Sequence, residues 1–234
     1  MANYESAELY DKIYGFKNYA QEAELIHQTI QQFKPGAKTL LDVACGTGKH
    51  LEPLKTCYQV EGLDLSADLL REARKRNPEL SFHQGDMRNF ELRKRFDAVT
   101  CLFSAVGYMN GPEELQQAMN TMAKHLEPGG VLLLEPWIFP QDWESGHLGI
   151  NVVDELGLKL VRINRSRLEG RHSVLMFHYI QATHQEIQHW DEEHPLFLFT
   201  RGEYEGALER AGLSVQFDEP GIAGRGLFTG IKGR

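Results

Sequence analysis

Short apolar segments alternate with amphipathic segments between residues 39 and 135, and this alternation constrains the fold more than any other feature. Five segments are predicted as strands: 39–44, 58–64, 80–84, 96–102 and 130–135. Apolar residues at helical spacing predict helices between most of them, at about 48–55, 67–76 and 113–126. Short apolar strands joined by helices form a parallel sheet that is covered on both faces. The chain is therefore predicted to be an α/β protein.

The two ends of the chain complete this fold. Apolar residues at helical spacing predict a helix over 18–33, within an N-terminal helical cap of residues 1–36. Near the other end, Thr200 and Glu203 stand at capping-box spacing, and a helix begins there. Two strands at about 213–218 and 226–232 follow, which gives a seven-stranded, mostly parallel sheet.

The region after Pro136 has a different pattern. Stretches 151–164 and 172–199 alternate in polarity and are rich in β-branched and aromatic residues, without a helix between them. We expect antiparallel strands, forming an insertion at about 138–199 for substrate binding or dimerisation. No linker is evident, so residues 1–234 are predicted to form one domain.

Charge and cysteine content limit the classes of partner. The net charge of −8 disfavours nucleic acid, because affinity for nucleic acid comes mainly from clustered Lys and Arg. No apolar stretch approaches membrane-spanning length, and the first residues are polar and acidic. Three cysteines, Cys45, Cys57 and Cys101, lack metal-site spacing, and we expect them to be reduced. These features predict a cytoplasmic protein with a small substrate and no membrane partner.

The stretch LLDVACGTGKH, residues 40–50, predicts a ligand-binding turn. A strand that ends near Asp42 leads into Gly46 and Gly48, and a helix follows. Such a turn presents backbone N–H groups at the carboxyl edge of a sheet. A dinucleotide-binding loop has a third glycine where this chain has Leu51, so the neighbouring residues decide which ligand is bound.

Carboxylates follow three successive predicted strands. Asp42, Asp64 and Asp86 each stand at a strand's carboxyl end, and Met87 adjoins Asp86. Asp64 is placed to accept hydrogen bonds from ribose hydroxyls, and Asp86 with Met87 suits an adenine amino group and ring. Together with the loop D-x-A-C-G-T-G, this set resembles the S-adenosylmethionine (AdoMet) fingerprint of class I methyltransferases.

The resemblance implies a Rossmann-like fold, AdoMet as cofactor and S-adenosylhomocysteine as product. Tyr10 and Tyr19 match aromatic positions that close over AdoMet in the family, although each tyrosine could also simply pack a helix. Leu102 and Phe103 follow the fourth strand, where they would line the cofactor pocket. The complete set of implied cofactor residues is Tyr10, Tyr19, Asp42, Ala44, Gly46, Gly48, Asp64, Leu65, Asp86, Met87, Leu102 and Phe103.

The residues after the fourth predicted strand indicate which kind of group can accept the methyl group. Enzymes that methylate amides or adenine carry Asn or Asp, then Pro-Pro and an aromatic residue there, whereas this chain reads LFSAVGYM. No cluster of carboxylates predicts a metal site. His184, His189 and His194 lie five residues apart, and a polar loop explains them better than a set of metal ligands.

Longer stretches resemble the bacterial N,N-dimethyltransferases that act on dTDP-3-amino-3,6-dideoxyhexoses, the desosamine and mycaminose type, in antibiotic biosynthesis. The matching stretches are AELYD, LLDVACGTGKHL, QGDMRNF, FDAVTCLFSAVGYM, EPWIFP, FTRGEYEGALERAGLSV and GRGLFTG. This resemblance implies two successive methyl transfers to the amine of a nucleotide-linked sugar, by a homodimer.

One position departs from that family. Its members usually have His in the segment where this chain has Tyr108. Methyl transfer from a sulfonium needs mainly a neutral amine held in line, so a strong base is optional. A phenol with an ordinary pKa of about 10 can orient an amine but is a poor base at neutral pH. Tyr108 is therefore expected to orient the acceptor, with packing beneath the loop as the alternative.

Five residues are predicted to bind the acceptor. Arg225, between two glycines, is expected to bind the substrate diphosphate, or else to lie in a surface turn. Arg162 and His178 could add to the anion site, on whichever face of its strand each lies. Trp137 could wall the sugar or base or pack in the core, and Tyr4 matches a family position near the acceptor.

Three other functions remain open from the sequence. The chain could methylate a free small amine or amino acid. A nicotinamide-dependent oxidoreductase shares the strand-turn-helix start, although Leu51 and the GDM segment argue against it. An AdoMet-binding protein without catalytic activity would carry the same cofactor motifs.

Overall fold

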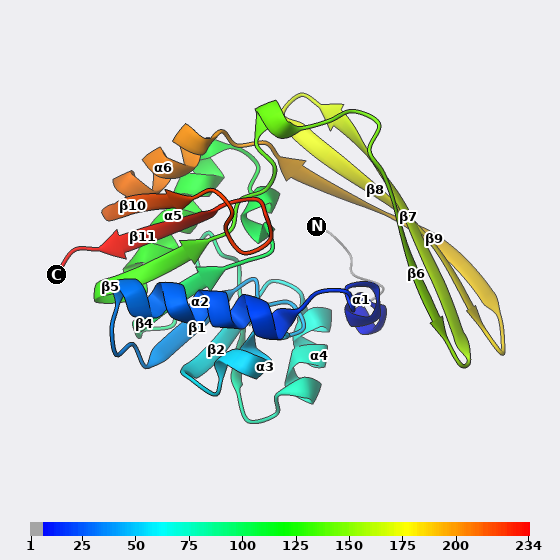
Figure 1. The fold of residues 1–234 in the computed structure, drawn as a ribbon, viewed down its shortest axis with the longest axis horizontal. Coiled ribbons are helices and arrows are strands. Elements are labelled where there is room, and N and C mark those ends of the chain that lie inside the picture. The colour runs from blue at the N-terminus through cyan, green and yellow to red at the C-terminus, as the bar shows by residue number, and fades with distance from the viewer. Residues whose placement is uncertain (1–6) are drawn as a thin grey trace.

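A computed structural model describes residues 7–234, which form two β-sheets and the helices around them (Figure 1). Within this part of the chain, the larger sheet has seven strands in the order β10-β11-β5-β4-β1-β2-β3. The bounds of these strands are β1 Thr39–Val43, β2 Gln59–Asp64, β3 Ser81–Gln84, β4 Phe96–Cys101, β5 Leu126–Leu134, β10 Leu213–Asp218 and β11 Leu227–Lys232. Strands β1 to β5 pair in parallel, and β11 is antiparallel to both β5 and β10. The prediction of a mostly parallel, seven-stranded Rossmann-like sheet is confirmed.

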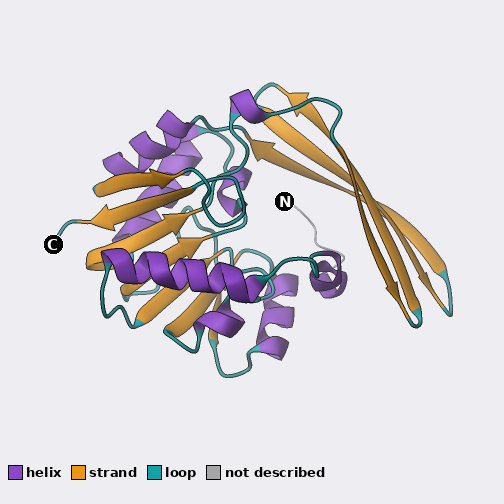
Figure 2. Ribbon diagram, in the orientation of Figure 1, coloured by secondary structure: helices purple, strands orange, loops and turns teal. Residues whose placement is uncertain are grey.

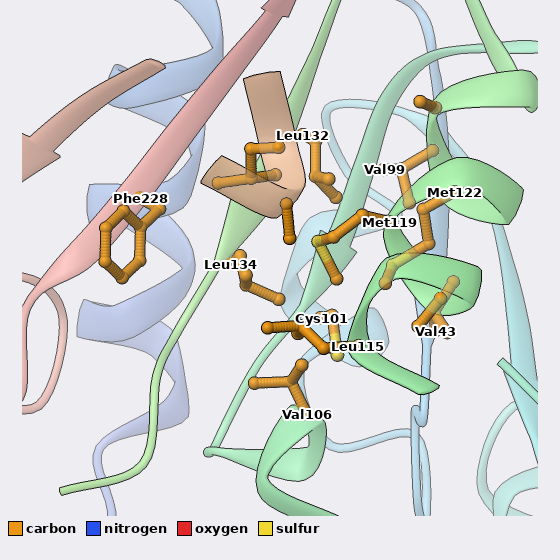
Figure 3. Packing of buried hydrophobic residues seen from close by; sticks show 14 of the residues in the cluster. Val43, Val99, Cys101, Val106, Leu115, Met119, Met122, Leu132, Leu134 and Phe228 are labelled. Atoms are coloured by element: carbon orange, nitrogen blue, oxygen red, sulfur yellow. The ribbon is translucent and has the colours of Figure 1, made fainter. Parts of the chain in front are cut away.

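Helices cover both faces of this sheet (Figure 2). Their bounds are α1 Ala7–Ile13, α2 Tyr19–Phe33, α3 Leu51–Leu54, α4 Ala67–Arg76, α5 Pro112–Lys124 and α6 Arg201–Arg210, with short 3₁₀ turns η1 Ala105–Tyr108 and η2 Pro140–Asp142. Alternate residues of each strand point to opposite faces, which gives two buried clusters. Leu41 and Val43 pack with α5 and α6, whereas Leu40 packs with α2 and α3. Figure 3 shows the α5 side of this core, where Met119 and Met122 lie against the strands.

Two predicted boundaries of the α/β part of the chain differ most from the structure. The helix expected over 48–55 is reduced to α3, because Gly46 and Gly48 adopt left-handed backbone angles that a helix cannot contain. The strand expected to begin at 130 begins instead at Leu126, directly after α5, since Leu126 already pairs with Phe96 of β4. The capping box at Thr200 and Glu203 forms as predicted at the start of α6.

The smaller sheet is a four-stranded antiparallel meander in the described chain, with the order β6-β7-β8-β9. Its strands are β6 Leu148–Glu155, β7 Leu158–Glu169, β8 His172–Thr183 and β9 Ile187–Phe197. The expected antiparallel insertion is therefore present, as four strands joined by tight turns. Its inner face packs on α1, where Ile13 is buried against Leu160, Phe177 and Tyr179 (Figure 1). None of the helices in residues 7–234 is long and apolar enough to cross a membrane.

Candidate active site

A cavity of about 1380 Å³ lies between the carboxyl ends of the parallel strands and the inner face of the smaller sheet. Both the glycine loop after β1 and residues of β7, β8 and β9 line it. Pockets for one small molecule usually measure about 300–1,000 Å³, so this cavity has room for two ligands. One of its ends is built from strand ends and the other from the antiparallel sheet.

The glycine loop turns sharply at the end of β1. Ala44 and Gly46 have φ of 60° and 56°, and the Gly46 N–H donates a hydrogen bond of 2.8 Å to Asp64 Oδ2. Both residues line the cavity. Gly48 does not, because it faces α4 and β3, where an added Cβ would lie 3.4 Å from Ala73 and 3.5 Å from the ring of Phe82. Gly48 therefore serves close packing beneath the loop, and only Gly46 of the two glycines approaches the cavity.

The two carboxylates nearest the loop are deeply buried. Asp64 accepts hydrogen bonds from the N–H groups of Gly46 and Ser66, and burial raises its pKa. Each of its oxygens has a second lone pair, which can accept a ribose hydroxyl. Asp42 accepts a hydrogen bond of 2.7 Å from Thr100 Oγ1, and burial raises the pKa of Asp42 to about 6. A cationic ligand would stabilise the ionised form of this carboxylate.

Asp86 and Met87 line the cavity after β3, as does Leu65 after β2. The carboxylate of Asp86 accepts hydrogen bonds from the backbone N–H and the guanidinium of Arg88, which hold its pKa below the usual range. Arg88 also binds Glu114 at 2.7 Å. Asp86 is thus fixed in place but shared with a neighbouring guanidinium, which the sequence did not indicate.

A charged group at the start of α2 was missed by the sequence analysis. Lys17 Nζ lies 2.8 Å from Glu22 Oε1 and 4.1 Å from the ring centroid of Phe103, and its side chain is almost fully buried. Glu22 Oε2 is also 2.7 Å from His50 Nε2. All four residues line the cavity. No motif marks this group, because it forms only when α2 packs beside the glycine loop.

The first helix lies over the glycine loop, at the end of the cavity that is built from the ends of the parallel strands. Tyr10 and Tyr19 line the cavity, and burial raises the pKa of both phenols. Asp11 accepts a hydrogen bond of 2.6 Å from Thr47 Oγ1 in the glycine loop, and it also pairs with Arg76 of α4. These contacts fasten α1 over the loop. Tyr10 and Tyr19 thus line the cavity, and their closing over AdoMet stays a prediction.

The chain makes a strained turn directly after β4. Phe103 and Ser104 have φ of 52° and 63°, which L-residues rarely adopt. Glu135, a buried residue at the end of β5, accepts a hydrogen bond of 2.6 Å from the Phe103 N–H. Ser104 Oγ donates to the Pro136 carbonyl at 2.6 Å. The turn leaves Leu102 and Phe103 lining the cavity and directs the chain into η1.

Tyr108, at the end of η1, is held by the antiparallel sheet. Its hydroxyl lies 2.7 Å from Nδ1 of His194 in β9, and His194 Nε2 lies 3.2 Å from Glu192 Oε2. Tyr179 donates its hydroxyl to the same carboxylate oxygen at 3.2 Å. The turn η1 also lies close to Trp137, and this requires glycine at position 107, because a Cβ there would lie 3.1 Å from Trp137 Cβ.

The histidines of this region do not lie where the sequence led us to expect them. The expectation of a polar loop is wrong for His189 and His194, which both belong to β9, where their odd spacing places them on opposite faces. His194 is 2% exposed and His189 lies on the outer face. Among residues 7–234, no group of three or more His, Cys, Asp or Glu is arranged to hold a metal ion.

Arg225 and Trp137 lie close together at the wall of the cavity. Arg225 Nη2 donates to Glu135 Oε1 at 2.9 Å, so Glu135 fixes both this guanidinium and the turn after β4. The Arg225 guanidinium lies 5.9 Å from the ring centroid of Trp137. In the described part of the chain, Arg225 Nε and Trp137 Nε1 are buried donors without a hydrogen-bond partner. Both residues line the cavity, where these donors can bind an acceptor group of a ligand.

Arg162 and His178 lie on opposite faces of the smaller sheet. Arg162 is buried on the inner face and donates to Asn151 Oδ1 at 2.7 Å and to the Tyr14 hydroxyl at 2.9 Å. His178 pairs in register with Ile163, one residue from Arg162, and therefore points outward. It binds Asp191 and does not line the cavity, so its assignment to the anion site is not supported. Tyr4 lies outside the described residues.

The fold and the site together define the class of protein. Strand-end carboxylates around a Gly-x-Gly turn, in a sheet with this strand order, are the features of a class I, AdoMet-dependent methyltransferase. Residues 40–130 match the family described as a methyltransferase domain. The residues of the site fit AdoMet, because the buried carboxylates of Asp42 and Asp64 and the buried ammonium of Lys17 face one end of the cavity.

Comparison with known proteins places the chain more narrowly. It is 45% identical to the dTDP-3-amino-3,6-dideoxy-alpha-D-glucopyranose N,N-dimethyltransferase of Streptomyces fradiae, over 98% of this chain and 91% of that protein. It is 43% identical to the dTDP-3-amino-3,4,6-trideoxy-alpha-D-glucopyranose N,N-dimethyltransferase of Streptomyces venezuelae, over 99% of both chains. The chain belongs to this family of dTDP-aminosugar N,N-dimethyltransferases, as its sequence motifs indicated.

Solved structures agree with this placement. The structure of Streptomyces venezuelae DesVI superposes with a TM-score of 0.93 at 42% identity, over 97% of this chain and 98% of that one. AdoMet-bound CalS10, an amino pentose methyltransferase from Micromonospora echinaspora, superposes with a TM-score of 0.88 at 39% identity, over 96% of both chains.

Proposed function

We propose that the chain transfers methyl groups from AdoMet to the amino group of a dTDP-linked aminodeoxysugar, in two successive steps that give the N,N-dimethyl product. The observation that carries the proposal is 40–45% identity to three such enzymes over at least 97% of the chain. This identity extends through the antiparallel sheet, whose inner face lines the acceptor end of the cavity.

The proposed cofactor residues follow from the geometry of the strand ends. AdoMet supplies a methyl group that is activated by attachment to a positively charged sulfur. Asp64 would accept the ribose hydroxyls, and Asp86 with Met87 would contact the adenine. Asp42 and the loop at Gly46 would face the amino acid part, for which buried Lys17 adds a positive charge. Tyr10 and Tyr19 would close over the bound cofactor.

The proposed anion site is centred on Arg225. Glu135 neutralises part of the guanidinium charge but engages only Nη2, and buried Nε remains to donate to a phosphate oxygen. Trp137 Nε1 provides a second donor nearby. A diphosphate would give both donors the acceptors that they lack within the described chain. Tyr108 would lie toward the amine, and Arg162 would act mainly by holding α1 and β6 through Tyr14 and Asn151.

Product analysis by mass spectrometry tests this function. Purified protein with AdoMet and dTDP-3-amino-3,6-dideoxyglucose should give a product with one and then two added methyl groups, whereas glycine should remain unmethylated. The Arg225→Ala variant should raise KM for the sugar nucleotide by about tenfold or more, the loss of one charge-assisted hydrogen bond to phosphate. Arg201→Ala removes an exposed arginine of α6 and serves as the matched control. Turnover of glycine with no turnover of the sugar nucleotide would contradict the proposal.

We also propose that the enzyme is a homodimer. On the outer face of the smaller sheet, Leu148, Ile150 and Val152 are 72%, 64% and 63% exposed, and Ile163 lies beside Ile150. A second copy of this chain would cover these apolar side chains. Light scattering should give about twice the 26.7 kDa chain mass, and Ile150→Asp should give the monomer. An unchanged mass in this variant would refute the assignment of that face.

The proposed compartment is the cytoplasm. Cys45, Cys57 and Cys101 are free thiols, as is typical of proteins in a reducing environment. Fractionation of the producing cells tests this assignment.

A further inference from the structure

We propose that Glu135 is a positioning residue that couples the two ligand sites, so that AdoMet and the sugar nucleotide each raise the affinity of the enzyme for the other. The proposal rests on the proposed function, and in particular on the assignment of the substrate diphosphate to Arg225. Glu135 directly follows β5, and its side chain is 2% exposed. It is not one of the described residues that line the cavity, so it acts on a ligand only through the residues that it holds.

The first of these residues is Phe103, in the turn after β4. Its backbone N–H donates a hydrogen bond of 2.6 Å to Glu135 Oε2. Phe103 and Ser104 have positive φ values, a conformation that is unfavourable for both residue types, so the turn would relax without an acceptor that holds it. The centroid of the Phe103 ring lies 4.1 Å from Lys17 Nζ, at the end of the cavity proposed for the amino acid part of AdoMet. A relaxed turn would therefore disturb the cofactor site.

The second residue is Arg225, in the loop between β10 and β11. Arg225 Nη2 donates to Glu135 Oε1 at 2.9 Å, and the guanidinium lies 5.6 Å from the centroid of the Phe103 ring. Gly224 and Gly226, on either side of Arg225, leave this segment many backbone conformations. The ion pair with Glu135 fixes the one in which Arg225 lines the cavity.

Glu135 thus joins two segments of the cavity wall that come from different parts of the sequence. Its two contacts use separate oxygens of one carboxylate, so both form only in a single arrangement of Phe103, Glu135 and Arg225. The strain in the turn provides an alternative, a relaxed turn in which the Phe103 N–H leaves Glu135. Each ligand binds the joined arrangement, AdoMet beside Phe103 and the diphosphate through Arg225. The first ligand to bind therefore increases the population to which the second binds.

Direct electrostatics between the ligands predicts the opposite sign. Lys17 and Arg225 both lie near the Phe103 ring, and the ligand groups proposed for them are a carboxylate and a diphosphate. Two anions at neighbouring sites repel each other, so each ligand would weaken the binding of the other. Positive coupling would therefore report on the shared arrangement held by Glu135, and its sign can be measured.

Calorimetric titrations of the wild type measure this coupling. S-adenosylhomocysteine stands in for AdoMet, and dTDP tests the diphosphate site without a sugar that would contact the other ligand. The Kd of dTDP should be lower by about fivefold or more when S-adenosylhomocysteine is saturating, and the Kd of S-adenosylhomocysteine should fall by the same factor when dTDP is saturating. Kd values that are unchanged or higher in the presence of the other ligand would overturn the proposal.

Glu135→Gln should remove the coupling while keeping the size of the side chain. An amide has only one acceptor oxygen, so either the Phe103 N–H or Arg225 Nη2 would face an N–H group instead. Each ligand should then bind alone as tightly as it binds with the other, to within about twofold. Glu135→Asp is one methylene shorter and cannot reach both donors, so it should show the same loss and keeps the experiment decisive if Glu135→Gln does not fold. Coupling of wild-type size in a folded variant would contradict the role of Glu135.

Glu127→Gln is the matched control. Glu127 belongs to β5 itself, near the opposite end of the strand, and it does not line the cavity. This variant should keep the wild-type coupling, because Glu127 holds neither Phe103 nor Arg225. Loss of coupling in this variant as well would show a general change in β5 and would count against the proposal.

Turnover gives a second readout that a purely structural role would not change. In the wild type, KM for AdoMet should fall as the fixed concentration of dTDP-3-amino-3,6-dideoxyglucose rises, whereas in Glu135→Gln it should stay constant to within about twofold. If dTDP and S-adenosylhomocysteine bind the wild type independently while the amino sugar is methylated, the coupling is rejected and the proposed function stands. If dTDP does not bind and the amino sugar is not methylated, the proposed function is rejected, and the coupling with it.

Discussion

Asp42 is predicted to destabilise the ligand-free protein at neutral pH, and Asp42→Asn to relieve that cost. Burial raises the pKa of Asp42 from 3.8 to about 6, a difference worth about 3 kcal/mol. The folded state therefore binds this proton more tightly than the unfolded state does. As pH rises from about 4 to about 6, the unfolded chain has already lost the proton, so the free energy of unfolding falls. Above about pH 7 the cost is fully present.

Urea unfolding of the ligand-free protein at several pH values between about 4.5 and 8 measures this effect. Asparagine keeps the size of the side chain and can still accept the hydrogen bond from Thr100. The stability of Asp42→Asn relative to wild type should rise with pH by about 2 kcal/mol across this range, because about 1 kcal/mol of the total cost is already present at about pH 4.5. If an N–H of the new amide has no hydrogen-bond partner, the stability of the variant is lowered by about the same amount at every pH. The decisive quantity is therefore the change with pH of the stability difference between variant and wild type.

Asp97→Asn is the control of opposite sign. The carboxylate of Asp97 accepts hydrogen bonds from the backbone of Lys38 and Thr39, and these hold its pKa below the usual range despite the cost of burial. Asp97 therefore stabilises the fold above its ordinary pKa, and that contribution is lost as pH falls. Asp97→Asn should become less stable relative to wild type as pH rises. A stability difference for Asp42→Asn that does not change with pH would refute the reasoning.

Three further predictions concern the cofactor, the acceptor site and the last helix. Affinity for AdoMet should fall as pH decreases through about 6, because protonation of Asp42 removes a negative charge facing a cationic ligand; calorimetry should show no such change in Asp42→Asn. Gly107→Ala should lower turnover while leaving S-adenosylhomocysteine binding unchanged, since the new Cβ would lie 3.1 Å from Trp137 Cβ and 3.2 Å from Leu196. Thr200→Ala removes the side-chain cap of α6 and should lower the free energy of unfolding by about 1 kcal/mol, measured in urea.

The clustering of residues at the strand ends was predictable because local sequence determines it. In a parallel sheet, residues that follow successive strands meet at one edge, so Asp42 and Asp64 could be placed together from their position in the chain. Gly48 was expected at the ligand but packs on α4 instead, because a glycine motif does not distinguish approach to a ligand from close packing on a neighbouring helix. Lys17 and Glu22 were missed because their burial depends on how α2 packs beside the loop.

The part of the cavity lined by the smaller sheet was less predictable, because it depends on which face of each strand meets the cavity. Alternation places Arg162 and His178 on opposite faces of the smaller sheet, but only its packing on α1 shows which face is the inner one. The contact between Tyr108 and His194 joins residues 86 positions apart in the sequence. The sequence around Tyr108 is that of a turn and the sequence around His194 is that of a strand. Neither pattern indicates that the two residues meet.

The two ends of the cavity are nevertheless held by one residue. Glu135 accepts the Phe103 N–H with Oε2 and the Arg225 guanidinium with Oε1, and it is almost fully buried. A buried carboxylate with both oxygens engaged has little freedom to move, because each displacement would leave a buried donor without its acceptor. The turn after β4 and the guanidinium of Arg225 are thus positioned by the same side chain. Tyr108 lies five residues after Phe103 in the sequence, so the end of β5 also positions the start of the segment that carries Tyr108.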